Sequence, residues 1–261
     1  MKRFDEMREK SLDEKIKYSL SLIEKTLAKH SPEYCIACSF GKDSTVLLHL
    51  VRQVEPNIKV IFNNTGIEFK ETLQFRDFLV KEWNLNYYEL HPDKSFWQCV
   101  EEYGFPKQRF KGKTHSGGKP KCCYYLKMRP AQLFYKKNGI KCVFVGITYD
   151  ESYQRKWQII RHTDYYYVKK EKIYKTLPLA YWNEDEVWEY IKRYNLPINP
   201  AYEKYDIRRV GCIPCTAHKG WKEQMARLYP GLYKKIMRDM NGSNLDDFSK
   251  EKIKEIRRVV C

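Results

Sequence analysis

Six residues, Ser39-Phe40-Gly41-Lys42-Asp43-Ser44, connect two apolar runs of this chain. The run before them, 34–38, is typical of a short buried strand, and the run after them, 45–51, is typical of the first turns of a helix. A glycine-containing turn between a strand and a helix presents backbone N–H groups and the positive end of the helix dipole to an anion. Gly41 lets the backbone approach that anion closely, Lys42 adds a positive charge, and the two serines add hydroxyl donors. The six residues therefore predict a phosphate-binding turn.

Strands and helices alternate through most of the chain. We expect strands at 34–38, 58–62, 87–90 and 142–146, and helices at 12–30, 70–83, 95–103 and 127–137. This alternation predicts an α/β fold with a doubly wound, mostly parallel sheet. Beyond about residue 160 we expect an edge strand at 165–168, a helix from the Asn183 cap to Tyr194, and a C-terminal section of helices and loops. The predicted domains are an N-terminal helix (1–30), a nucleotide-binding α/β core (31–180) and a C-terminal helical section (181–261).

Three segments follow predicted strands of this sheet, at 39–44, 63–66 and 146–155. Right-handed crossovers in a parallel sheet place a bound nucleotide beyond the carboxyl ends of the strands. We therefore expect these segments to contribute to the nucleotide site. The segment 109–121 is different, because its three glycines and its lack of an apolar period are typical of a mobile loop.

The composition indicates a folded protein with a basic surface. The chain has 261 residues, 43% of them hydrophobic and 15% aromatic, and no apolar run approaches the ~20 residues that span a bilayer. Its charged N-terminus lacks the apolar core of a signal peptide, so we expect a cytoplasmic protein with no membrane contact. The net charge of +16 favours a polyanionic partner such as nucleic acid; the alternatives are a general bias toward lysine in the source proteome and a site for several phosphates.

Four of the nine cysteines form two close pairs, Cys122-Cys123 and Cys212-Ile213-Pro214-Cys215. A reducing compartment argues against disulfides, so a metal centre is the expected use of such pairs. Adjacent cysteines fit poorly around one tetrahedral zinc ion, whereas a 4Fe–4S cluster offers a separate iron to each thiolate. Basic residues at 121, 127 and 129 flank the first pair; they either neutralise substrate phosphates or form a solvated helix start. Cys35, Cys38 and Cys142 lie in apolar runs and are expected in the core.

The Ser39–Ser44 turn resembles the Ser-Gly-Gly-x-Asp-Ser loop of the PP-loop ATP pyrophosphatases, with Phe40 in place of the first glycine. It differs from the P-loop of common ATPases in its spacing. The resemblance implies that residues 39–44 bind ATP and that ATP is cleaved between the α and β phosphates. Lys42 and Ser44 are then expected to hold the departing pyrophosphate, and Asp43 to help hold Mg²⁺, which makes these three the candidate catalytic residues.

The cysteine pairs and two further segments resemble the iron–sulfur branch of the phosphoadenosine/adenosine phosphosulfate reductase family. The resemblance implies an adenine nucleotide alpha-hydrolase-like fold and a 4Fe–4S cluster on Cys122, Cys123, Cys212 and Cys215. The run that begins Asn64-Thr65-Gly66 is similar to the family's Asp-Thr-Gly segment, and Gly146 to Arg155 is similar to its Gly-x-Arg-x-x-Glu-Ser-x-x-Arg segment. Thr148 stands where the family usually has arginine. The resemblance adds these nucleotide-binding residues: Asn64, Thr65, Gly66, Gly146 and Arg155.

Two features favour ATP-driven sulfur transfer over sulfonucleotide reduction. The reductases of this family attack sulfur with a cysteine in a Glu-Cys-Gly-Leu-His-like segment, which is not found here; Cys261 is either a nucleophile on a tail or an idle residue. The Gly-Lys-Asp-Ser part of the turn is intact, as in ATP-cleaving relatives. We expect sulfur transfer onto tRNA or DNA, a cysteine desulfurase or another sulfur donor, and a homo-oligomer. The alternatives are an adenylyl or phosphoadenylyl sulfate reductase and a nucleotide-binding module without turnover.

Overall fold

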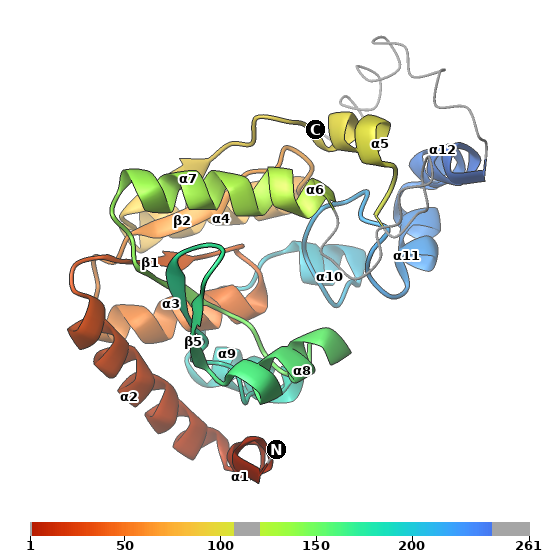
Figure 1. Cartoon of the computed structure of the whole chain (residues 1–261). Helices are drawn as coiled ribbons and strands as arrows, with labels where there is room; N and C mark the ends of the chain where they lie inside the picture. Colours follow the sequence, from red (N-terminus) through yellow and green to blue (C-terminus); the bar gives the residue numbers. More distant parts are fainter. Residues whose placement is uncertain (1, 107–120, 242–261) are drawn as a thin grey trace. The chain divides into compact units, whose positions relative to one another are not determined.

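The computed structural model describes residues 2–106 and 121–241 (Figure 1). The strands are β1 (Tyr34–Ala37), β2 (Val60–Asn63), β3 (Tyr87–Leu90), β4 (Cys142–Val145), β5 (Tyr165–Val168) and β6 (Ile173–Thr176). The first helices are α1 (Lys2–Arg8), α2 (Leu12–His30), α3 (Lys42–Val54), α4 (Lys70–Glu82) and α5 (Phe96–Tyr103). A composite helix follows, with α6 (Lys121–Cys123), the π-helical turn η1 (Tyr124–Met128) and α7 (Arg129–Lys137). The last helices are α8 (Tyr153–His162), α9 (Glu184–Arg193), α10 (Ala201–Tyr205), α11 (Trp221–Leu228) and α12 (Pro230–Asn241).

The chain forms two compact units that interleave in sequence. The first, here called the sheet unit, holds the described residues of Met1–Phe62, Phe75–Glu89 and Gln132–Asn199. The second, here called the cysteine unit, holds those of Asn63–Gln74, Leu90–Ala131 and Pro200–Cys261. Cys261 and nearly all of the segment 109–121, for which a mobile loop was predicted, lie outside the described residues.

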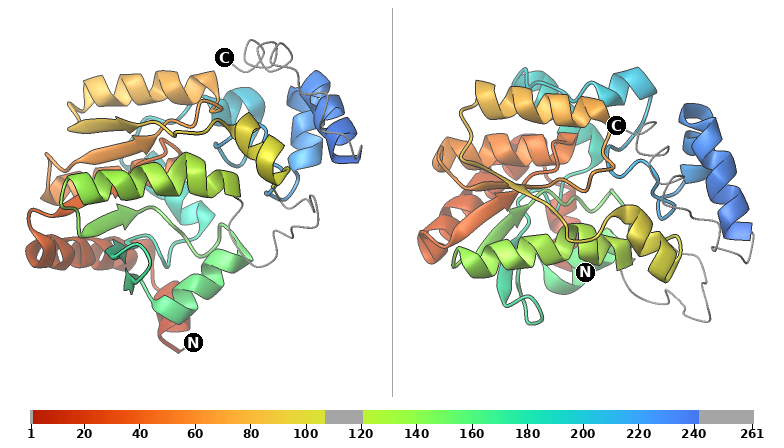
Figure 2. Two further views of the ribbon diagram at one scale, coloured as in Figure 1. Left: turned by 45° about the horizontal axis from the view of Figure 1, so that its top comes forward. Right: turned by 90° about the horizontal axis from the view of Figure 1, so that it is seen from above.

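The sheet has the order β3-β2-β1-β4-β6-β5. β1 pairs in parallel with both β2 and β4, so that Ile36 lies opposite Val60 on one side and Phe144 on the other. β4 and β6 are also parallel, and β5 pairs antiparallel with β6 at the edge. α3 and α9 cover one face of the sheet and α7 covers the other (Figures 1 and 2). The predicted doubly wound, mostly parallel α/β fold is confirmed.

Buried side chains on the central strands and on α3 form the core of the sheet unit. Cys35 and Cys142 are fully buried in β1 and β4, as expected for small core residues. Their burial raises the pKa of Cys142 to about 11, so this thiol stays protonated at neutral pH. Lys15 of α2, 1% exposed, pairs with Glu186 of α9 at 2.7 Å. The helix layer is therefore joined by a buried ion pair as well as by apolar packing.

The predicted helix starts are confirmed where a capping box marks them. In α2 the Ser11 side chain accepts the N–H of Glu14 while Glu14 accepts the N–H of Ser11, and Asn183 and Glu186 do the same for α9. β6 and α8 are among the elements that were not predicted. β6 is half-buried, with polar and aromatic residues at its centre. α8 has only one fully buried residue, Ile159, and exposes its aromatic side chains Tyr153 and Trp157.

Among the described residues, no helix combines the length and the apolarity that crossing a bilayer requires.

Candidate functional site

The turn between β1 and α3 is braced by the hydroxyl of Ser44. This hydroxyl accepts the backbone N–H of Ser39 at 3.2 Å and that of Gly41 at 3.1 Å, and it donates to the Gly41 carbonyl at 3.0 Å. The Ser39 hydroxyl lies 3.2 Å from it as well. Gly41 caps α3, so the first N–H groups of that helix, which have no partner inside it, lie at the turn. The predicted turn is therefore present, with Ser44 as its internal brace.

Phe40 occupies the position where the similar Ser-Gly-Gly-x-Asp-Ser loop has glycine, and the backbone conformation there explains why glycine is favoured. Its φ of 55° lies in the left-handed region, which costs a non-glycine residue about 1–2 kcal/mol. Its ring is fully buried and packs edge-to-face on Phe62, with ring centroids 5.4 Å apart. Its carbonyl accepts a hydrogen bond from the buried Asn199 side chain at 3.0 Å. Apolar burial and this hydrogen bond offset the backbone strain and hold the turn.

Lys42 opens α3 and is paired with two carboxylates. Its ammonium lies 3.3 Å from Asp43 and 3.5 Å from Glu184, and the Lys42 side chain is only 9% exposed. Glu184 begins α9, and its backbone N–H donates to Asp150 at 3.3 Å. Sequence reasoning missed Glu184 as a site residue, because 142 positions along the chain separate it from Lys42 and it read as part of a helix cap.

Carboxylates beside a turn that binds phosphates would suit Mg²⁺, and such a turn is predicted here. Mg²⁺ is usually bound through one or two carboxylates together with substrate phosphates and waters, not by an all-protein cage. Asp43 and Glu184 supply the two carboxylates around Lys42. The donor set of the sheet unit therefore fits the predicted ion, with Glu184 added to Asp43.

Gly146 follows β4 and packs directly on the start of α3. A Cβ at this position would lie 3.1 Å from the Asp43 carbonyl oxygen and 3.2 Å from the Ser44 Cα. Both are backbone atoms of the first helical turn, which has little room to move. Gly146 is thus needed because two backbones approach closely there. Arg155, another predicted nucleotide-binding residue, lies in the first turn of α8 and pairs with Glu151.

We predict that Gly146→Ala destabilises the protein by about 1–3 kcal/mol, the usual range for overpacking. The matched control is Gly231→Ala, because a Cβ at Gly231 meets nothing within 4 Å. Equilibrium unfolding in urea measures both. Equal stability of the two variants would contradict the close backbone approach at Gly146.

In the cysteine unit the four predicted ligands come together. A hydrogen bond with Cys123 raises the pKa of the Cys122 thiol well above its usual value, and burial and the thiols of Cys123, Cys212 and Cys215 raise it further. The Cys215 N–H donates to the Cys212 carbonyl at 3.2 Å, which closes the Cys-x-x-Cys turn. The tandem pair and the turn thus lie near enough within one unit to interact electrostatically.

The spacing of these thiols bears on the kind of metal. Among residues 2–106 and 121–241, no three cysteine, histidine, aspartate or glutamate side chains are close enough together to hold a single metal ion. A zinc ion needs all its thiolates about 2.3 Å from one centre, whereas a cube-shaped cluster gives each thiolate its own iron. A 4Fe–4S cluster on the four thiols stays a prediction.

The predicted nucleotide-binding residue Thr65 lies beside the cysteine turn. Its hydroxyl is 3.7 Å from the Cys212 sulfur, and the Ile213 N–H donates to the Ile67 carbonyl at 2.8 Å. The carboxylate of Glu68, which is 8% exposed, accepts the N–H groups of Thr65 at 3.1 Å and Ile67 at 3.2 Å. Sequence reasoning missed Glu68, although its Thr-x-x-Glu spacing from Thr65 is the signal of such a turn.

Three further residues shape this region of the cysteine unit. The Asn64 side chain accepts the N–H of Gly66 at 3.0 Å, and Gly66 has a φ of 75°, which favours glycine. Lys127 lies in the π-helical turn η1, where the nearby thiol of Cys212 raises the pKa of the Lys127 ammonium. Single π-helical turns are frequent at functional sites. Lys127 thus places a positive charge near the thiols of Cys212 and Cys123.

Comparison with known proteins identifies the family. A model described as "Phosphoadenosine phosphosulfate reductase domain" matches residues 33–218. An uncharacterized protein of Methanocaldococcus jannaschii is 32% identical over 223 residues, which cover 83% of this chain; the chain spans under half of that relative, 43%. An adenosine 5'-phosphosulfate reductase of Staphylococcus haemolyticus is 29% identical over 79% of this chain and 80% of its own length.

The phosphoadenylyl-sulfate reductase of Candida auris, solved with phosphate, has a similar fold. Its TM-score is 0.55 at 18% identity, and the match covers 81% of this chain and 95% of that one. The family match spans most of the sequence, and this protein therefore belongs to the phosphoadenosine phosphosulfate reductase domain family.

Proposed function

We propose that this protein binds ATP at the β1–α3 turn, cleaves it to AMP and pyrophosphate, and uses the activated substrate for sulfur transfer onto nucleic acid. The observation that carries the proposal is the arrangement at the start of α3. There a serine-braced turn, a helix N-terminus and the Lys42 ammonium lie together with the carboxylates of Asp43 and Glu184. Helix N-termini and ammonium groups bind phosphates, and paired carboxylates bind the Mg²⁺ that accompanies them.

The proposed reaction has two steps. An oxygen of the acceptor attacks the α-phosphorus of ATP, a new P–O bond forms, the α–β phosphoanhydride bond breaks, and pyrophosphate leaves. A sulfur nucleophile from a donor then forms its bond to the activated atom, and AMP leaves with the oxygen. Lys42 neutralises charge that develops on the leaving pyrophosphate, and the N–H groups of residues 39–44 orient the phosphates. Asp43 and Glu184 hold Mg²⁺, which neutralises phosphate charge when bound.

The cysteine unit is the proposed site of a 4Fe–4S cluster on Cys122, Cys123, Cys212 and Cys215, with zinc as the less favoured occupant. When bound, the cluster supplies an iron for sulfur binding or for electron transfer. Lys127 supplies a positive charge that offsets the charge of the thiolates, and the Thr65 hydroxyl lies next to the Cys212 sulfur. We place the protein in the cytoplasm as a homo-oligomer, with tRNA or DNA as acceptor and a cysteine desulfurase or another protein as sulfur donor.

Pyrophosphate release tests the proposal. Protein prepared without oxygen is incubated with Mg²⁺ and ATP, alone and with tRNA or DNA, and both AMP and pyrophosphate are measured. We expect more pyrophosphate when the acceptor is present. AMP should reach an equal amount only when sulfide is added as sulfur donor, because AMP leaves in the second step. The absence of pyrophosphate in every arm would sink the proposal.

A second candidate is a sulfonucleotide reductase. The observation in its favour is the 29% identity to the Staphylococcus haemolyticus adenosine 5'-phosphosulfate reductase over 80% of that enzyme. The same protein, incubated with adenylyl sulfate or phosphoadenylyl sulfate and a thiol reductant, should release sulfite if this candidate is correct. Sulfite without pyrophosphate would replace the leading proposal by this one.

A further inference from the structure

The outer face of α8 carries two large aromatic side chains in water. Tyr153 is 75% exposed and Trp157 is 43% exposed. They lie one helical turn apart, with ring centroids 5.9 Å apart in an edge-to-face arrangement. The opposite face of α8 is buried through Ile159, which packs with Phe4 of α1. The two rings are therefore not part of the core that holds α8 in place.

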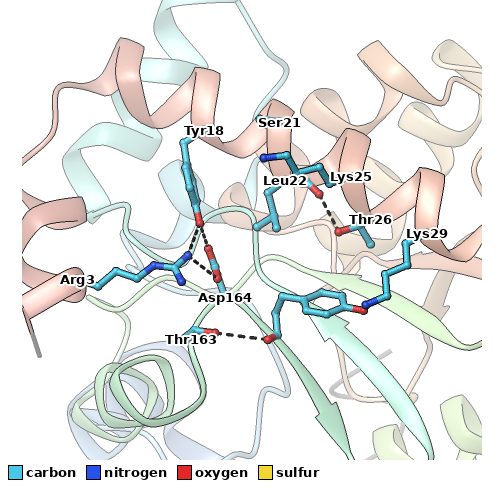
Figure 3. Close-up of a pocket in the computed structure, with 10 residues that line it drawn as sticks. Arg3, Tyr18, Ser21, Leu22, Lys25, Thr26, Lys29, Thr163 and Asp164 are labelled. Carbon is cyan, nitrogen blue, oxygen red and sulfur yellow. Dashed lines mark hydrogen bonds and ion pairs between the residues drawn. The ribbon is translucent and has the colours of Figure 1, made fainter.

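Basic side chains continue this surface beyond the aromatic pair. Arg161 lies one turn after Trp157 on the same face of α8 and is exposed. The residues that follow α8, Thr163 to Tyr165, line an open cleft of about 470 Å³ between α2 and the start of β5 (Figure 3). Arg3, Lys25 and Lys29 also line this cleft, and all three are exposed.

The charge balance of the cleft is positive. Asp164 is its one carboxylate among the lining residues described, and it is buried and already engaged. It accepts a hydrogen bond from Tyr18 and pairs with Arg3 at 3.5 Å, as Figure 3 shows. The Lys29 ammonium lies 4.9 Å from the centre of the Tyr165 ring. Arg3, Lys25 and Lys29 thus leave the cleft with a surplus of positive charge next to the end of α8.

We propose that the outer face of α8 and this cleft bind a single-stranded stretch of nucleic acid. Bases stack on Tyr153 and Trp157, and backbone phosphates follow Arg161, Lys25 and Lys29. Exposed aromatic rings beside a basic groove are the combination by which proteins hold single strands without sequence preference. A duplex hides the faces of its bases, so the aromatic pair selects unpaired nucleotides. This inference rests on the nucleic-acid acceptor of the proposed function and names the surface that holds it.

Binding is tested without ATP, so that it is separate from catalysis. Fluorescence anisotropy is measured with full-length protein and labelled single-stranded RNA, single-stranded DNA and duplex DNA, each of about 20 nucleotides. We expect both single strands to bind, the tighter one identifying the acceptor, and the duplex to bind at least about tenfold more weakly. Tyr153→Ala and Trp157→Ala are each expected to weaken single-strand binding about tenfold, whereas Trp157→Phe keeps most of it.

Charge and aromatic controls make the test specific. Lys25→Gln and Lys29→Gln are each expected to reduce the slope of log K against log salt by ~0.7. Phe78→Ala is the matched aromatic control, because Phe78 is 49% exposed on α4, and it should bind as the wild type does. Unchanged binding by both alanine variants on α8, or a duplex bound as tightly as a single strand, would overturn the inference. Loss of binding in these variants supports the surface even if pyrophosphate is never released, and pyrophosphate release without such loss supports only the proposed function.

Discussion

Replacing Lys42 by alanine is expected to lower the rate of pyrophosphate release by about 10²–10³-fold, or about 3–4 kcal/mol of transition-state stabilisation. The reason is the position of its ammonium, at the start of α3 and 3.3–3.5 Å from two carboxylates. As the α–β bond breaks, negative charge gathers on the leaving pyrophosphate, and a nearly buried cation interacts with it more strongly than an exposed one. Single-turnover pyrophosphate release at saturating ATP measures the loss.

Lys141→Ala is the matched control for this experiment. Lys141 is 63% exposed and pairs with Glu33 at 2.8 Å on the surface of the sheet unit, so its removal should leave pyrophosphate release unchanged. Lys42→Arg is expected to recover only part of the rate, because a planar guanidinium does not reproduce a compact ammonium. If Lys42→Ala released pyrophosphate at nearly the wild-type rate, the β1–α3 turn would not be the site of ATP cleavage.

Cys212→Ser is expected to lower the iron bound per chain by at least about tenfold, with loss of visible absorbance. The serine hydroxyl stays protonated at neutral pH, so it does not replace a thiolate as a ligand. Cys212 also contacts Thr65 and interacts electrostatically with Lys127, so its loss removes the thiolate that these residues surround. Iron and acid-labile sulfide are measured after anaerobic reconstitution, together with the absorption spectrum.

Cys142→Ala provides the comparison, because Cys142 is a fully buried thiol of β4. It is expected to keep its iron and to lose about 1 kcal/mol of stability from the small cavity left behind. Iron content that is equal in Cys212→Ser and Cys142→Ala would remove the cluster from the four-cysteine set. If one zinc ion per chain were found in place of iron, the four cysteines would remain the ligands and the metal would be zinc.

Local patterns predicted the elements that position the turn at 39–44. β1, α3 and the caps of α2 and α9 were readable because each depends on neighbours three or four positions away, as in Ser11 with Glu14. β6 and α8 were missed for the opposite reason. β6 is held by strand pairing with residues distant in sequence, as when its Lys175 lies opposite Val143 of β4. α8 buries only Ile159 fully, and that residue packs in a cluster with residues far away along the chain.

The candidate sites show the same division. The chain's own order of residues determined the turn at 39–44 and the two cysteine pairs, since each is a short motif whose chemistry follows from residue type and spacing. Only the tertiary structure brought Glu184 to Lys42, the Gly146 backbone to Asp43, and Thr65 to Cys212. These contacts join segments 103 to 147 positions apart, and no pattern of neighbouring residues records them. They exist because sheet pairing and core packing, which act between distant segments, place backbones and side chains together after the local elements have formed.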